Sequence, residues 1–153
     1  MMSMHKGFAS NCIWTYLTGE PFSQAVWDRH LLTAFDASRP LTEKATLLTI
    51  GWRSAAPPAR ARQQLAARLA SSEPYLRAIA GSAMVFDSKL ARGTLTAINW
   101  IARKPYPEKV FGHLDGALAW LSRLTPAFDA RIVWKSIVDT VPRELLLVQY
   151  SGR

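Results

Sequence analysis

Short apolar runs and longer amphipathic stretches take turns along the chain. The apolar runs are rich in β-branched and aromatic residues, which is typical of buried strands. They predict strands at residues 11–18, 45–52, 79–86 and 108–112. The stretches that follow them have helical length or spacing, and predict helices at residues 22–35, 59–72, 89–103, 116–124 and 128–141. Because residues 128–141 are rich in Ile and Val, a strand there stays open as an alternative.

The stretch at residues 89–103 has the clearest helical period. One face carries the positions that we expect to pack inward, namely Leu90, Thr94, Ala97, Ile98 and Ile101. The opposite face carries Arg92, Thr96, Asn99 and Arg103. Pro105 and Pro107 are expected to end this helix, because a proline disfavours helical backbone in the residue before it.

Strands that alternate with helices predict a single α/β domain, with a mostly parallel or mixed sheet of four to five strands covered by helices. We expect residues 8–125 to form its core and residues 126–153 to add a C-terminal helical extension. Residues 1–7 are expected to be flexible, Asp115 to cap the helix that follows it, and residues 144–150 to form a last short strand.

Composition agrees with a folded domain of 153 residues, since 49% of the residues are hydrophobic and 20% are charged. No apolar run approaches the roughly 18 residues of a membrane span, and the first residues lack the pattern of a signal peptide. The single cysteine, Cys12, has no partner for an internal disulfide. We therefore expect a cytoplasmic location, with Cys12 as a small buried residue.

The net charge of +8 and the isoelectric point near 10.2 favour acidic partners. Nucleic acids, acidic proteins or peptides and anionic lipid headgroups all satisfy that condition. An excess of Arg and Ala also fits a GC-rich genome, so the charge alone does not select among these partners.

Motifs for common chemistries are missing from the chain. The sequence has no HExxH, CxxC, P-loop, GxGxxG or G-x-S-x-G pattern, and its three histidines lie at no metal-ligand spacing. We therefore predict no catalytic residue, no metal and no cofactor. An enzyme whose active site combines distant residues stays open as an alternative.

One local string resembles a known family. "VFGHLDGALAWL", residues 110–121, is similar to the fourth strand and fourth helix of SpoIIAA-like (STAS, or SEC14-like) domains, and the order of elements over residues 8–125 also fits them. The matching parts are Val110 and Phe111, then Asp115, then residues 117–121. Such domains are mostly adaptors and regulators. The resemblance therefore implies a STAS-like fold and a binding function without catalysis.

The same resemblance makes Ser88 a candidate phosphorylation site. In anti-sigma-factor antagonists of this family, a serine at the junction of the third strand and third helix is phosphorylated, and Asp87-Ser88 lies at that junction. The family pattern continues with Ser or Thr and a small residue, whereas this chain has Lys89 and Leu90. The alternative is that Ser88 or Asp87 caps the helix.

Two surfaces are candidate binding sites. The first is a groove at the carboxyl ends of the strands, lined by Trp52, Arg53, Ser88, Lys89 and Arg92, where a peptide carboxylate or a phosphate would bind. The second is the basic and aromatic hook of "NWIARKPYPEK", formed by Trp100, Arg103, Lys104, Tyr106 and Lys109. For the hook, the alternative is a half-buried Trp100 among solvated cations. An exposed edge strand is a further place for an extended peptide.

These observations favour a non-catalytic module that binds a protein or an acidic peptide, as a regulator or accessory (adaptor) protein. A basic nucleic-acid-binding protein is the first alternative, and a small-ligand or lipid carrier or an unrecognised enzyme is the second. A homodimer stays open as an assembly.

Overall fold

The structure is a computed structural model that describes residues 1–36, 43–71, 73–93, 96, 104–146 and 150. Its strands are β1 (Ser3–Ala9), β2 (Cys12–Gly19), β3 (Ala45–Ser54), β4 (Ile79–Phe86) and β5 (Glu108–Phe111). Its helices are α1 (Gln24–Ala34), α2 (Ala59–Ser71), α3 (Glu73–Leu76), α5 (Leu114–Leu124) and α6 (Ala130–Thr140), with a 3-10 turn at Arg143–Leu145. Residues 89–93 are also helical.

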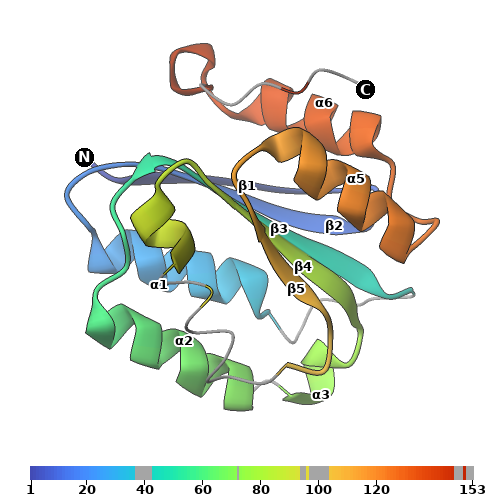
Figure 1. The fold of residues 1–153 in the computed structure, drawn as a ribbon, viewed down its shortest axis with the longest axis horizontal. Helices are drawn as coiled ribbons and strands as arrows, with labels where there is room; N and C mark the ends of the chain where they lie inside the picture. Colours follow the sequence, from blue (N-terminus) through green and yellow to red (C-terminus); the bar gives the residue numbers. More distant parts are fainter. Residues whose placement is uncertain (37–42, 72, 94–95, 97–103, 147–149, 151–153) are drawn as a thin grey trace.

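The five strands form one mixed sheet in the order β1-β2-β3-β4-β5. β1 pairs antiparallel with β2, and every other neighbouring pair is parallel. Helices α1 and α2 lie below the sheet in Figure 1, and helices α5 and α6 lie above it. The predicted α/β domain with a mixed, mostly parallel sheet is confirmed.

Strand β1 was not expected. Residues 3–7 fall in the segment predicted to be flexible, but they pair residue by residue with β2, so the prediction is wrong for them. Ser10 and Asn11 join the two strands with φ angles of 50° and 56°. Two consecutive residues with positive φ make the type I′ turn that suits a two-residue hairpin.

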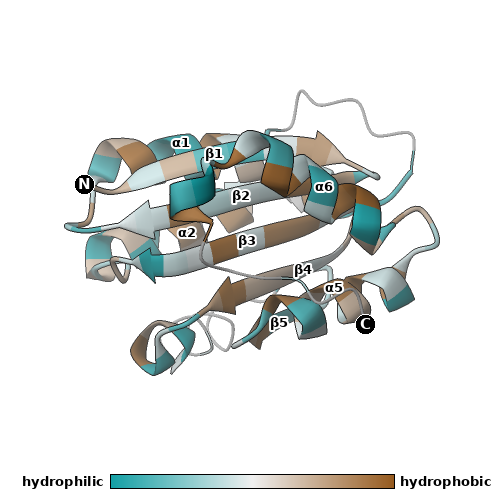
Figure 2. Ribbon diagram, turned by 90° about the horizontal axis from the view of Figure 1, so that it is seen from above, coloured by the Kyte–Doolittle hydropathy of each residue, from teal (hydrophilic) through white to brown (hydrophobic). Residues whose placement is uncertain are grey.

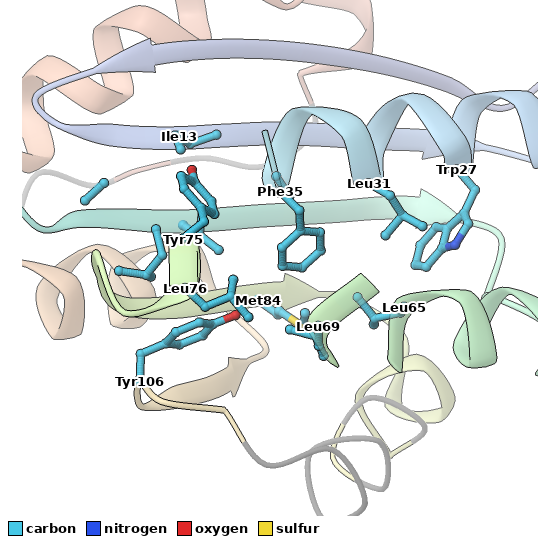
Figure 3. Packing of buried hydrophobic residues seen from close by; sticks show 14 of the residues in the cluster. Ile13, Trp27, Leu31, Phe35, Leu65, Leu69, Tyr75, Leu76, Met84 and Tyr106 are labelled. Carbon is cyan, nitrogen blue, oxygen red and sulfur yellow. The ribbon is translucent and has the colours of Figure 1, made fainter. Parts of the chain in front are cut away.

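Two hydrophobic layers hold the helices to the sheet. Below it, Trp27 and Leu31 of α1 lie opposite Leu65 and Leu69 of α2, with Met84 of β4 between the helices and the sheet (Figure 3). Above it, buried residues of β2 to β4 pack against α5 and α6. The central strands are therefore covered on both faces, and apolar colour runs along much of β3 and β4 in Figure 2. This confirms the prediction that the apolar run at residues 45–52 forms a buried strand.

Helix ends and the C-terminal residues show two further differences. Asp115 lies in the first turn of α5, and the cap position belongs to His113, so the predicted cap is wrong. α6 is a helix, as predicted, and the carboxylate of Asp129 caps it by accepting from the backbone N–H groups of Arg131 and Ile132. The last strand predicted at 144–150 is wrong where it overlaps the 3-10 turn, and residues 147–149 lie outside the described residues.

No described helix has both the length and the apolar character needed to cross a membrane.

Candidate binding site at the carboxyl ends of the strands

Parallel pairing brings the carboxyl ends of β3, β4 and β5 to one edge of the sheet. We call this region the carboxyl edge and define it by Arg53, Asp87, Ser88, Lys89 and Leu90. In open α/β sheets, ligands bind beyond these ends, because the loops there converge from several strands. Hydrogen bonds between those loops fix the positions of the residues at the carboxyl edge.

The first link joins the loops after β3 and β4. The backbone N–H of Arg53 donates to Oδ1 of Asp87 at 3.2 Å. Arg53 has a φ of 46°, which is uncommon for a residue with a side chain. Two residues further on, the N–H of Ala55 donates to the carbonyl of Gly19 at 3.1 Å, which adds the end of β2. Three strand ends are thus held together while Arg53 remains exposed.

Ser88 begins the helix that follows β4. Its Oγ accepts from the N–H of Ala91 at 3.3 Å, and its carbonyl accepts from the N–H of Arg92 at 3.0 Å. The predicted capping role is therefore confirmed for Ser88, whereas the carboxylate of Asp87 accepts from Arg53 instead. Ser88 is exposed, and its phosphorylation stays a prediction.

Arg92 is tied into the fold. Its Nη1 donates to the carbonyl of Phe86 at 2.7 Å and to that of Asp87 at 3.2 Å. The same nitrogen would lie 3.3 Å from a Cβ built on Gly112, so the guanidinium passes close to the loop between β5 and α5. Arg92, predicted on the outer face as a binding cation, is half-buried and spans the ends of β4 and β5.

The first turn of this helix is oriented differently from the prediction, while Thr94, Ala97, Ile98 and Ile101, which were also predicted to face inward, lie outside the described residues. Leu90, which was expected to face the core, is 75% exposed, and Ala91 is buried at 1%. The inward prediction for Leu90 is therefore wrong. Lys89 beside it is exposed, so the first turn presents a cation and an apolar side chain together.

Trp52 contributes less surface than predicted. It is half-buried, and its side chain packs against the hydrophobic layer under α5 and α6. Its indole Nε1 is buried without a hydrogen-bond partner. Trp52 therefore belongs to the packing between the sheet and helices α5 and α6, and it offers little of its ring to a ligand.

The predicted basic and aromatic hook is not an exposed surface at Lys104 and Tyr106. The Lys104 side chain is 5% exposed and forms an ion pair with Glu108, while Tyr106 is buried and points toward Met84 in Figure 3. Burial lowers the pKa of Lys104 by more than the nearby carboxylate of Glu108 raises it. Burial raises the pKa of Tyr106. Both residues belong to the core, which corrects the expectation that they meet a partner.

Other hook residues lie elsewhere. Lys109 on β5 is exposed, with its Nζ 5.5 Å from the centre of the Phe111 ring. Trp100 and Arg103 lie outside the described residues. The hook therefore contributes one exposed cation to the described surface.

Sequence reasoning missed a buried polar cluster below the sheet. His30, Lys104, Tyr106 and Glu108 line a cavity of about 20 Å³ between α1, α2 and the sheet. Burial lowers the pKa of His30 to about 4, so its imidazole is neutral, and its Nδ1 has no hydrogen-bond partner. The two prolines around Tyr106 are typical of an exposed loop and gave no signal of this burial.

At the carboxyl edge, the exposed residues carry two cations, the carboxylate of Asp87, a hydroxyl and a leucine. The Oδ1 of Asp87 accepts from the backbone of Arg53, and the two cations leave the surface with a net positive charge, which suits binding to an acidic and partly apolar surface. Among the described residues, no group of three or more His, Cys, Asp or Glu side chains could hold a metal ion. Comparison of the chain with family models, curated proteins and solved structures found no match.

Proposed function

We propose that this protein is a non-catalytic binding module for an acidic protein or peptide, and that the carboxyl edge is its docking surface. The observation that carries the proposal is the 75% exposure of Leu90 on a helical turn that also exposes Lys89. An apolar anchor beside a cation is the combination that an acidic partner with an apolar side chain would cover.

The energetics favour such a partner. Full burial of a leucine contributes about 1.5–3 kcal/mol, and the cations speed encounter with an acidic surface. The links from Arg53 to Asp87 and from Arg92 to Phe86 already fix the loops at the edge. Because these loops are ordered before a partner arrives, binding loses little conformational entropy there.

The resemblance to SpoIIAA-like domains supports a regulatory or accessory role in the cytoplasm. The alternation of strands and helices from β2 to α5 is the order on which that resemblance rests. A phosphate on Ser88 would add about −1.5 to −2 charges next to Lys89. It would therefore weaken the attraction for an acidic partner.

The test is selection of a displayed random peptide library on the immobilised protein, followed by calorimetry with the enriched peptides. We expect acidic sequences with at least one large apolar residue. The double variant Lys89→Glu, Leu90→Ser should weaken binding at least about tenfold, which is 1.4 kcal/mol. A glutamate is well tolerated in the first turn of a helix, so this variant should fold.

Arg131→Glu is the matched control, because Arg131 is an exposed cation in the first turn of α6, on the face of the sheet away from α1 and α2. It changes the net charge by the same amount as Lys89→Glu and should leave affinity unchanged. Equal losses in both proteins would show nonspecific charge attraction and contradict the proposal. Binding to single-stranded DNA that falls steeply with salt and ignores Leu90→Ser would point to the nucleic-acid alternative.

A further inference from the structure

A groove of about 510 Å³ lies between β1 and α1, far along the sheet from β5. We call it the β1–α1 groove, and the lining residues that matter here are Met4, Lys6, Phe8, Arg29, Leu32 and Asp36. Phe8 is 46% exposed and Leu32 is 59% exposed. Two large apolar side chains therefore meet solvent in one concave place.

β1 is an edge strand of the sheet. It pairs with β2 on one side, and no strand in the described part of the chain pairs with its other side. In Figure 1, β1 lies between α1 below and α6 above, so helices cover both of its faces. Every second residue of an edge strand turns its backbone N–H and C=O outward, and these groups can pair with another extended chain.

The side chains of β1 divide by face. Met4, Lys6 and Phe8 line the groove, in the order apolar, basic, apolar. Gly7 faces the other way, because a Cβ built on it would lie 2.5 Å from the ring of Trp14, which belongs to the layer under α6. A strand added beside β1 would place its own alternate side chains next to this apolar, basic, apolar row.

Charge selects the occupant. Lys6 and Arg29 are exposed cations, and Asp36 is the one acidic residue lining the groove. A second copy of this chain would bring another Lys6 and another +8 of net charge to the same edge. An acidic segment of a different protein meets no such repulsion.

We propose that β1 accepts an extended acidic segment of a partner protein as a sixth strand of the sheet. The segment carries the pattern apolar-x-acidic-x-apolar. Its acidic side chain lies beside Lys6 and Arg29, and its apolar side chains lie beside Met4 and Phe8. Backbone pairing gives affinity and the alternate side chains give specificity. This site is separate from the carboxyl edge and does not depend on the function proposed for that edge.

The test uses a synthetic peptide, acetyl-Ser-Val-Thr-Glu-Thr-Val-Ser-amide with a fluorescent label, and measures its fluorescence anisotropy against the full-length protein. The sequence is palindromic, so it satisfies the pattern in either strand direction. Lys6→Glu should weaken this peptide about tenfold, and a second peptide with Lys in place of Glu should bind the variant better than the wild type. A lysine on an edge strand that only discourages aggregation would show neither effect.

Backbone pairing is tested with N-methylated peptides. N-methyl groups on the two Thr residues block one edge of the peptide, and N-methyl groups on Val and Glu block the other edge. Because the peptide is palindromic, reversing its direction turns the other edge toward β1, so a peptide methylated on one edge can still pair through its free edge. A peptide methylated on both edges has no edge left for pairing and should lose binding, and its binding as tightly as the unmethylated peptide would overturn strand addition.

The variant Lys89→Glu, Leu90→Ser separates this proposal from the preceding one. It should bind the probe peptide like the wild type. A loss of binding in this variant together with normal binding by Lys6→Glu would place the peptide at the carboxyl edge and overturn the inference. Absence of saturable binding up to about 1 mM peptide would also overturn it, as would a dimer that forms through β1 and excludes the peptide.

Discussion

At the scale of single residues, burial decides the chemistry that each polar side chain can perform. The sequence analysis predicted Lys104 and Tyr106 in an exposed basic and aromatic binding surface. The structure buries the Lys104 side chain against Glu108 and buries Tyr106 near Met84. Sequence alone could not show this, because Pro105 and Pro107 are typical of exposed loops and the packing involves α1, α2 and β4. The same layer contains His30 of α1, whose behaviour can be tested by pH.

His30 should make stability depend on pH. Its pKa is lowered by burial from 6.5 to about 4, so between these values the unfolded chain binds a proton that the folded protein does not. The free energy of unfolding should therefore fall as the pH drops from about 6.5 to about 4, by about 3 kcal/mol from this group. Urea unfolding at a series of pH values measures the loss.

His30→Phe is the comparison, because phenylalanine keeps a ring beside Trp27, whose centre lies 5.1 Å from the imidazole. The charged groups that share the cavity, Lys104 and Glu108, are present in both proteins. The variant should lose less stability over the same pH range, and the difference between the two curves belongs to His30. Parallel curves would show that protonation of His30 does not destabilise the fold.

At the scale of elements, hydrophobic runs along the sequence predicted the buried strands correctly, but they did not predict the edge strand β1. β3 is an almost continuous apolar run because helices cover it on both faces. β1 gives no such run, because it contains Lys6 on one face and Gly7 under the Trp14 ring on the other. Asn11 carried a local signal of the hairpin, because asparagine adopts a positive φ more readily than most residues with a side chain.

The helix after β4 shows why part of the candidate site was predicted and part was not. Its start at Ser88 was predictable, since a serine between an apolar strand and a helical period is typical of a cap. The orientation of its first turn was not, because Arg92 reaches back to the carbonyl of Phe86, a contact that the periodicity of residues 89–103 does not encode. That contact places Leu90 outward, where the proposed docking surface needs it.

Ser88→Ala should lower the free energy of unfolding by about 1 kcal/mol, because the N–H of Ala91 loses its acceptor. Ser88→Asp should stay near the wild type, since aspartate caps equally well. Chemical denaturation measures both. Ser122→Ala is the control, because Ser122 lies inside α5 and alanine is the better helix former there. A Ser88→Ala protein as stable as the wild type would refute the capping role.

At the scale of the whole molecule, the segment after residue 125 completes the core. α6 lies over β1 and β2, and the Nε1 of Trp14 donates to Oγ of Ser136 at 3.0 Å. The hydroxyl of Tyr16 donates to the carbonyl of Leu145 at 2.8 Å. Trp14 and Tyr16 are both 0% exposed. The resemblance covered residues 8–125 and left this segment as an extension, but the upper layer of the fold includes it.

Truncation after Thr125 should therefore abolish cooperative unfolding. Trp14 and Tyr16 would lose both their apolar cover and their hydrogen-bond partners, and exposed aromatic surface of this size favours a loosely packed state. We expect retained far-ultraviolet circular dichroism, lost near-ultraviolet signal and binding of the dye ANS. Truncation after Leu146 is the control, because it keeps α6 and the 3-10 turn and should unfold cooperatively. If the shorter chain kept a cooperative transition at the wild-type midpoint, α6 would be an appendage, and the sheet would be stable with its upper face at β1 and β2 uncovered.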